Sequence, residues 1–284
     1  MTHALANARI PKLSVVVPVH NEAPNIAPLV REIHDALAGG DPYEIIYVDD
    51  GSNDGTLEEL VSLMGRFPGL RVFRHALNCG QSTALLTGIR AARAPVIATL
   101  DGDGQNDPGD IPRLLGMLED PNRPEGLQMV AGLRRKRRDT PWRRLSSRIA
   151  NSVRRKFLKD DTPDTGCGLK VFYRDTFMEL PHFDHMHRFL PALVKRAGGT
   201  TLSVAVRHRP RVRGESHYGT LNRLRAGLVD MLGVMWLQRR VRLTDITEYL
   251  PGGGTPSPSG GEMKRLEDAS GPVPPKTGES RARE

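Results

Sequence analysis

Short apolar runs alternate with helix-like segments through the first half of the chain. Each run is mostly β-branched or aliphatic, and each helix-like segment repeats apolar residues at the spacing of one helix face. The expected strands are 13–17, 44–48, 70–73, 96–100 and 128–131, and the expected helices are 25–37, 55–64, 81–93 and 110–118. Because parallel strands need helical crossovers, this order predicts an α/β fold with a mainly parallel sheet covered on both faces.

The second half of the chain has a different pattern. A basic segment follows Gly132, and a helix over 188–197 and a strand over 202–206 are expected after it. A further helix over 221–243 has one apolar side, and Gly, Pro and Ser become frequent beyond Pro251, which is typical of disorder. We therefore expect four parts, namely an N-terminal extension (1–12), one main domain (13–219), an amphipathic helix (220–245) and a disordered tail (251–284).

Polar clusters directly follow four of the expected strands. They occupy residues 18–22, 49–56, 78–82 and 101–105. In open parallel sheets, ligands bind beyond the carboxyl ends of the strands. Four polar clusters at one edge of the sheet therefore predict a single site.

Asp101 and Asp103 are the most informative pair in these clusters. In extended backbone, residues two apart point to the same side, so both carboxylates can face one ligand. Their mutual repulsion would be relieved by Mg²⁺ or Mn²⁺, which prefer oxygen ligands, and Gly102 and Gly104 leave room beside the backbone. An isolated Asp-Gly-Asp is more often an ordinary acidic turn. The three other clusters favour the metal site.

The charge of the chain restricts the classes of partner that it is expected to bind. It carries 41 Lys and Arg against 33 Asp and Glu, a net charge of +8, and the excess is concentrated after Leu133. Such a surface attracts nucleic acid, anionic lipid or a phosphorylated substrate, although a solvated basic face explains most single residues. Aromatic residues make up only 5% of the chain and no nucleic-acid motif is present, which argues against nucleic acid.

Neither disulfides nor a membrane span are expected. Two cysteines form no disulfide framework and no zinc spacing, which favours a reducing compartment. No apolar segment precedes Lys12, and the longest one, 228–237, is interrupted by Asp230 and is shorter than the roughly 20 residues that a bilayer requires. We expect a cytoplasmic protein, peripheral at the membrane, with the 221–243 helix either in the interface or packed in a core or dimer.

The four clusters resemble the ordered motifs of family 2 glycosyltransferases with the GT-A fold. They read Pro-Val-His-Asn-Glu at 18–22, Asp-Asp-Gly-Ser-Asn-Asp-Gly-Thr at 49–56, Asn-Cys-Gly-Gln-Ser at 78–82 and Asp-Gly-Asp-Gly-Gln at 101–105. The chain is most similar to the polyprenyl-phosphate branch, of the dolichol-phosphate mannosyltransferase type. That resemblance implies a Rossmann-like fold and inverting transfer of a hexose, such as mannose or glucose, from GDP-mannose, UDP-glucose or a related donor. The acceptor would be dolichyl or undecaprenyl phosphate, and the cofactor Mg²⁺ or Mn²⁺.

The resemblance also assigns roles to individual residues. The nucleoside would be held by Pro18, Glu22 and Asp50, with Val48 lining the base pocket. The metal and diphosphate would be bound by Asp101, Gly102 and Asp103, with Gln105 nearby. The donor phosphate would meet Arg134, Arg211 and His217. The family usually has Lys at the last position, and because His is only partly protonated near neutral pH, Arg213 is an alternative.

The acceptor side is implied by two further segments. Arg143, Ser147 and Arg148 resemble the segment that meets the lipid phosphate, and Asp164 begins a match to the acceptor-loop motif. A solvated helix face explains the arginines equally well, and a helix cap or turn explains Asp164.

The sequence leaves open whether a catalytic base is needed and what the acceptor is. A phosphate acceptor is already anionic at pH 7 and needs no strong base, whereas the competing assignment makes Asp103 or Asp164 a base. The acceptor could instead be a soluble sugar or polysaccharide, and a nucleotide-sugar sensor is disfavoured by the intact aspartate pair. An anionic membrane surface and a separate membrane protein are the partners we expect.

Overall fold

The computed structural model describes residues 10–134, 158, 162–210 and 220–241. The chain divides into two units, Met1–Leu243 and Thr244–Glu284, and every described residue belongs to the first. Most of the expected N-terminal extension, the basic segment and the whole expected tail therefore lie outside the described residues.

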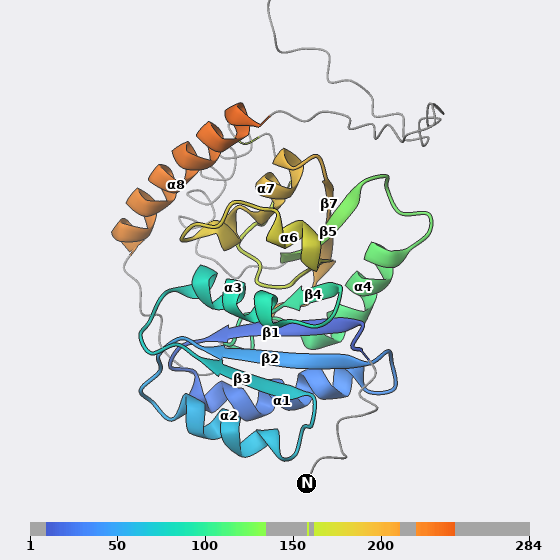
Figure 1. The fold of residues 1–284 in the computed structure, drawn as a ribbon, viewed down its shortest axis with the longest axis vertical. Coiled ribbons are helices and arrows are strands. Elements are labelled where there is room, and N and C mark those ends of the chain that lie inside the picture. The colour runs from blue at the N-terminus through green and yellow to red at the C-terminus, as the bar shows by residue number, and fades with distance from the viewer. Residues whose placement is uncertain (1–9, 135–157, 159–161, 211–219, 242–284) are drawn as a thin grey trace, which may run out of the picture. The chain divides into compact units, whose positions relative to one another are not determined.

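One mainly parallel sheet organises the described part of the chain (Figure 1). Its strands are β1 (Leu13–Val19), β2 (Tyr43–Asp49), β3 (Leu70–Arg74), β4 (Val96–Thr99), β5 (Leu127–Arg134), β6 (Lys170–Tyr173) and β7 (Thr200–Val206). Their order is β3-β2-β1-β4-β6-β5-β7, and only β6 runs antiparallel to its neighbours. The mainly parallel sheet is confirmed, and β6 is the strand that the hydrophobic pattern missed.

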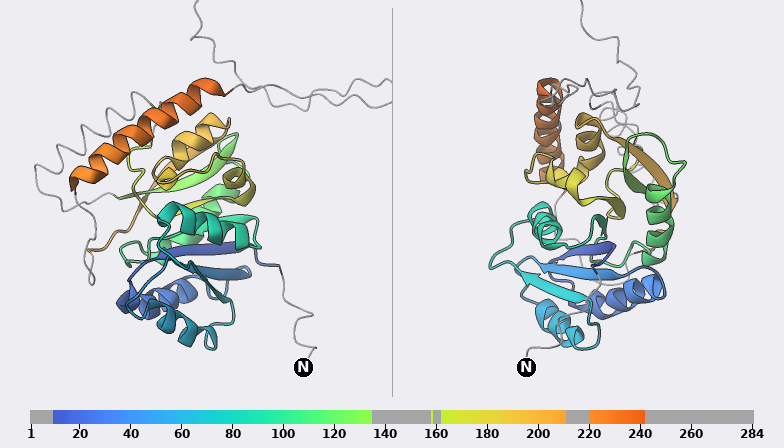
Figure 2. Two further views of the ribbon diagram at one scale, coloured as in Figure 1. Left: turned by 60° about the vertical axis from the view of Figure 1, so that its left-hand side comes forward. Right: turned by 45° about the vertical axis from the view of Figure 1, so that its right-hand side comes forward.

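Helices cover both faces of this sheet (Figure 2). They are α1 (Ala23–Leu37), α2 (Thr56–Met64), α3 (Gln81–Ala91), α4 (Ile111–Glu119), α6 (Arg174–Met178), α7 (Leu190–Arg196) and α8 (Thr220–Arg240), with 3-10 turns η1 (Pro108–Asp110) and η2 (Met186–Arg188). One core holds the apolar sides of α1, α2 and α4, and the other holds those of α3, α6 and α7. The six helices expected from the sequence are present, and α6 is additional.

Alternation along the strands explains why both faces are covered. Val15 and Val17 of β1 lie in the first core, whereas Val16 between them lies in the second. All three side chains are fully buried. A strand that is apolar on both sides can only be accommodated between two layers of helices, as in parallel sheets generally.

The helix α8 packs by one side only. Val234 is fully buried in the second core, and Arg196 of α7 donates from Nε to the Leu237 carbonyl at 3.0 Å. On the same helix, Val229, Leu232 and Trp236 are exposed. Among the described residues, no helix has the length and apolar character needed to cross a membrane.

Candidate functional site

The carboxyl ends of β1, β2 and β4 meet at one edge of the sheet. The N–H of Asp50 donates to the Val19 carbonyl at 2.8 Å, which joins the ends of β2 and β1. Gly102, just beyond β4, lies so close to β1 that an added Cβ would be 2.4 Å from Val19 Cγ1 and 3.2 Å from the Pro18 carbonyl oxygen. Glycine is therefore required at position 102, and the polar clusters that follow β1, β2 and β4 adjoin one another.

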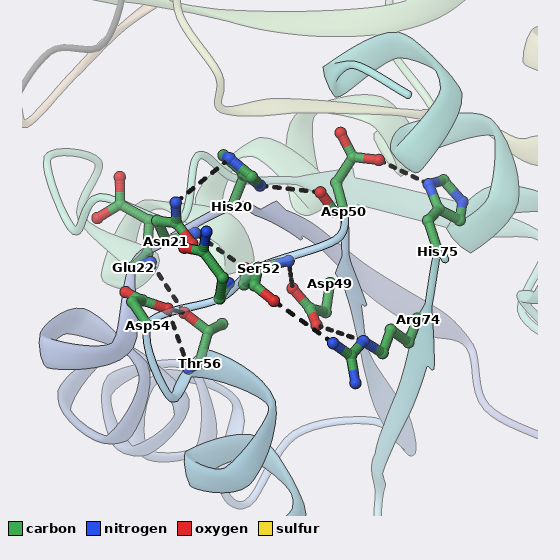
Figure 3. Close-up of polar contacts among 11 residues, drawn as sticks. His20, Asn21, Glu22, Asp49, Asp50, Ser52, Asp54, Thr56, Arg74 and His75 are labelled. Carbon is green, nitrogen blue, oxygen red and sulfur yellow. Dashed lines mark hydrogen bonds and ion pairs between the residues drawn. The ribbon is translucent and has the colours of Figure 1, made fainter. Parts of the chain in front are cut away.

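The loops after β1 and β2 hold each other through short polar side chains (Figure 3). The N–H of Asn21 donates to Ser52 Oγ at 2.9 Å, and the N–H of Asn53 donates back to Asn21 Oδ1 at 2.9 Å. The N–H of Glu22 donates to Thr56 Oγ1 at 3.0 Å. These reciprocal bonds join the two loops into one framework, because each loop accepts hydrogen bonds from backbone N–H groups of the other.

Asp50 connects this framework to the third polar cluster. Its side chain is buried, and its Oδ1 lies 2.7 Å from His75 Nδ1 and accepts the N–H of Cys79 at 2.9 Å. Its Oδ2 accepts the N–H of Gly80 at 2.8 Å. The sequence predicted Asp50 in the site but gave no role to His75, whose signal is only its position directly after β3.

Asp101 and Asp103 follow β4 at the same edge. Asp101 is partly buried and accepts a hydrogen bond from Gln81 Nε2 at 2.8 Å, while Asp103 accepts the N–H of Gln105 at 3.1 Å. Burial, and next the charge of Asp103, raise the pKa of Asp101 above its ordinary value. The two carboxylates form a donor set of hard oxygens, which fits Mg²⁺ or Mn²⁺.

The segment before β6 approaches Asp101 closely. A Cβ on Gly168 would lie 2.3 Å from the Asp101 carboxyl carbon, so only glycine permits this approach. Lys170, the first residue of β6, is buried, and its Nζ donates to the Cys167 carbonyl. Burial lowers the pKa of Lys170, and the nearby Cys167 and Asp101 oppose that shift. Lys170 was missed from the sequence, where a lone lysine among apolar residues was its only signal.

Arg134 and Asp164 form a bidentate ion pair behind Asp101. Arg134 Nε and Nη2 each lie 2.7 Å from an oxygen of Asp164, and the N–H of Arg134 donates to Oδ2 at 3.2 Å. Burial disfavours the charge of Arg134, but Asp164 outweighs it and the pKa of Arg134 is raised. The sequence analysis assigned Arg134 to the donor phosphate and Asp164 to the acceptor loop. In the structure the two side chains pair with each other.

Arg209 ties the end of β7 to the Asp103 loop. Its N–H donates to the Gln105 carbonyl at 2.8 Å, and Gln105 Nε2 lies 3.4 Å from the Arg209 carbonyl. Its guanidinium lies 2.7 Å from Glu32 and 3.1 Å from Asp107. A pocket of about 210 Å³ opens here, lined by Pro24, Asn25, Pro28, Leu29, Glu32, Asp103, Gly104 and Arg209.

The remaining predicted residues fall into two groups. Pro18 and Val48 are buried, and Val48 packs towards α3 in the second core, while Glu22 is partly buried and accepts a 2.6 Å hydrogen bond from Asn25. The other group lies outside the described residues and comprises Arg143, Ser147, Arg148, Arg211 and His217.

Known proteins are similar to this chain in sequence. Residues 14–180 match the family described as glycosyl transferase family 2. A dodecaprenyl-phosphate galacturonate synthase of Rhizobium johnstonii is 37% identical over 80% of this chain and 68% of its own length. An undecaprenyl-phosphate 4-deoxy-4-formamido-L-arabinose transferase of Edwardsiella ictaluri is 34% identical over 74% of this chain, which spans 63% of that relative.

Solved structures of low sequence identity share the fold. A mannosyltransferase of Pyrobaculum calidifontis, in complex with GDP-Man and Mn²⁺, superposes with a TM-score of 0.59 at 22% identity, over 79% of this chain and 64% of that one. A glucosyl-3-phosphoglycerate synthase of Mycobacterium tuberculosis, with Mn²⁺, UDP-glucose and glycerol 3-phosphate, gives 0.57 at 21% identity, over 84% and 83%. Together with the family match and the relatives above 30% identity, the sheet and its edge of carboxylates place the protein: the chain belongs to glycosyl transferase family 2 and is a glycosyltransferase of the GT-A fold.

Proposed function

We propose that this enzyme transfers a sugar, with inversion, from a nucleoside-diphosphate sugar to a polyprenyl phosphate such as undecaprenyl or dolichyl phosphate. The observation that carries the proposal is the pair Asp101 and Asp103 at the end of β4, beside the buried Asp50 and the Arg134–Asp164 ion pair. Two relatives above 30% identity are named for polyprenyl-phosphate acceptors, which supports the acceptor class.

The donor would lie across the β1, β2 and β4 ends. Glu22 and Asp50 would bind the nucleoside, with Pro18 and Val48 behind them, and Arg134, Arg211 and His217 would meet the phosphates. We propose a hexose as the sugar, with GDP-mannose and UDP-glucose as the first donors to test. The relatives are named for galacturonate and for 4-deoxy-4-formamido-L-arabinose, so donors of those sugars belong in the same test.

Asp101 and Asp103 would hold Mg²⁺ or Mn²⁺, with Gln105 close by. When bound, the ion supplies positive charge for the departing nucleoside diphosphate. Arg134 adds to that charge, since Asp164 keeps the guanidinium ionised and fixed in direction. Preorganised charge of this kind is usually the largest catalytic contribution.

The acceptor would need no strong base from the protein. A phosphomonoester is already anionic near pH 7, since its second pKa is about 6. Asp164 accepts three hydrogen bonds from Arg134, so its carboxylate already serves to hold that guanidinium. Arg143, Ser147 and Arg148 would orient the acceptor phosphate.

The test is a transfer assay with purified protein, Mn²⁺, undecaprenyl phosphate and a panel of radiolabelled nucleotide sugars. We expect label to enter the organic phase with at least one donor, and Asp101→Ala to abolish that transfer. Label that moves only to water-soluble acceptors would overturn the lipid acceptor and favour the soluble-acceptor alternative.

The exposed side of α8 would bring the enzyme to an anionic membrane. Val229, Leu232 and Trp236 lie at helical spacing on that side, and the exposed Arg239 and Arg240 follow within a turn. Apolar residues flanked by arginines are typical of helices that lie in the interface. We place this membrane contact at the cytoplasmic face, in agreement with the two free cysteines, and a membrane protein as a further partner.

Vesicle binding tests the role of α8. Leu232→Glu should weaken sedimentation with vesicles that contain phosphatidylglycerol, whereas Val61→Glu, at an exposed apolar residue of α2, should not. Equal loss in both variants, or in neither, would contradict the proposal.

A further inference from the structure

Three potential metal ligands of different chemistry converge beside the catalytic edge, by which we mean the carboxyl ends of β1, β2 and β4 with Asp101 and Asp103. They are Asp50 after β2, His75 after β3 and Cys79 before α3, and one ligand atom of each lies within 4.8 Å of the others. Asp50 is buried, His75 is partly buried and Cys79 is exposed. We propose that these residues form a second metal site, for a borderline-soft divalent ion such as Zn²⁺, separate from Asp101 and Asp103.

The surroundings of two ligands are already arranged for coordination. His75 Nδ1 lies 2.7 Å from Asp50 Oδ1, and His75 Nε2 lies 2.9 Å from Thr87 Oγ1. A divalent ion would replace the proton between Nδ1 and Asp50, and donation from Nε2 to the Thr87 hydroxyl would then hold the tautomer in which Nδ1 binds the metal. The Asp50 oxygen that faces away from His75 is fixed by the N–H of Gly80 at 2.8 Å. Partners of this kind set the tautomer and direction of ligands in metal sites generally.

Coordination needs small movements of the ligands, in which Asp50 and His75 separate slightly from their 2.7 Å hydrogen bond and Cys79 turns towards them. Tetrahedral zinc, with bonds of about 2.0 Å to nitrogen and 2.3 Å to sulfur, places its ligand atoms roughly 3.3 to 3.7 Å apart. Cys79 Sγ donates to the Leu77 carbonyl at 3.4 Å, which is a weak contact. Since that side chain is exposed, it can turn towards Asp50 without opening the core, and solvent can provide the fourth ligand.

Ligand chemistry separates this site from the catalytic pair. Asp101 and Asp103 offer only oxygen, which suits Mg²⁺ and Mn²⁺, whereas nitrogen and thiolate ligands select zinc or cobalt. Both sites can therefore be loaded in one protein with different ions.

Occupancy would also inhibit the enzyme. This part rests on the proposed function, in which Asp50 holds the nucleoside of the donor. An ion that takes the Asp50 carboxylate removes the hydrogen-bond acceptor that the nucleoside needs, so Zn²⁺ should act against the donor and not against the acceptor.

Cobalt is the probe for the test, because a thiolate bound to Co²⁺ absorbs in the near ultraviolet whereas oxygen ligands do not. Metal-free full-length protein is titrated with Co²⁺ in excess Mg²⁺, which keeps the oxygen-only pair occupied. We expect the thiolate band to saturate at one equivalent and to disappear when Zn²⁺ is added. The band should be absent in Cys79→Ser, and Thr87→Val should weaken Co²⁺ binding roughly tenfold, as expected for loss of an outer partner.

The matched control is Cys167→Ser, which removes the other cysteine, a buried one. It should keep the band, and circular dichroism should show each variant folded. A band that persists in Cys79→Ser, or no band in the wild-type protein, would overturn the site irrespective of any activity. In the transfer assay, Zn²⁺ inhibition that is lost in Cys79→Ser supports inhibition through Asp50, and equal inhibition of both proteins overturns it.

Discussion

The two sides of the catalytic edge are held together by different kinds of interaction. On the β1–β2 side, backbone N–H groups bind short polar side chains, as between Asn21 and Ser52 or Gly80 and Asp50. On the β5–β6–β7 side, charged side chains pair across the fold, as Arg134 does with Asp164. The first side is stabilised by many backbone hydrogen bonds. Replacing a single charged residue should therefore reduce activity most on the second side.

Asp101 touches both sides, so its replacement should have the largest effect. Asp101→Asn removes one of the two carboxylates proposed to hold the metal, and a loss of about 4 kcal/mol of transition-state stabilisation corresponds to roughly 1,000-fold in kcat/KM. Steady-state kinetics with saturating Mn²⁺ measures this. A loss under tenfold would contradict the assignment of Asp101 to the metal.

The same variant makes an opposite prediction for stability. The raised pKa of Asp101 means that the fold disfavours its ionised form, so the penalty is present at neutral pH and fades as the pH falls below the ordinary carboxyl pKa. Without metal, Asp101→Asn should raise the melting temperature at pH 7 and change it little at pH 3.5. Thermal melts in chelator at both values test the sign.

Gly168 tests how closely the second side must approach Asp101. In Gly168→Ala the new Cβ meets the Asp101 carboxyl at 2.3 Å, so that side chain must move. We expect kcat/KM to fall about 100-fold with a stability loss of about 1–3 kcal/mol, as for overpacked sites. Gly116→Ala in α4 is the control, since nothing lies within 4 Å of its added Cβ. Similar activity of the two variants would contradict a tight approach.

The Arg134–Asp164 pair should give a smaller effect. Asp164→Asn keeps the shape of the side chain but removes the charge that favours the Arg134 guanidinium, and we expect kcat to fall roughly tenfold. If no base is needed, as proposed above, its pH–rate profile should keep the wild-type shape. Complete loss of turnover with intact donor binding would instead identify Asp164 as essential for acceptor activation.

The first side could be predicted from the sequence because its residues directly follow parallel strands. Each apolar run ends in a cluster such as 101–105, and the end of a parallel strand places that cluster at the site without further information. Asp50, Asp101 and Asp103 therefore all appear where the pattern predicted them. Val48 is fully buried and packs towards α3, and its place at the base pocket stays a prediction.

The second side could not be predicted because its contacts depend on where β6 inserts in the sheet. β6 is short, begins with the charged Lys170 and inserts antiparallel between β4 and β5, which no local periodicity indicates. Its placement brings Gly168 to Asp101 and Asp164 to Arg134. Such contacts follow from the tertiary fold, and a pattern of single residues carries no signal for them.

Arg209 gives the smallest and most selective prediction. Its ion pairs with Glu32 and Asp107 are partly exposed, so Arg209→Ala should change stability by no more than about 1 kcal/mol. The same side chain steadies the backbone bond between Arg209 and Gln105, beside Asp103. We therefore expect a several-fold rise in donor KM with little change in kcat, because binding is affected before chemistry.

Lys12→Ala is the control for that experiment. Lys12 also pairs with two carboxylates, Asp41 and Glu119, but at the opposite end of β1. A comparable small change in melting temperature without a change in donor KM would show that location, and not the number of ion pairs, determines the kinetic effect. If both variants raise KM alike, the ion pairs of the second side act only through general stability, and the contrast between the two sides of the edge does not hold.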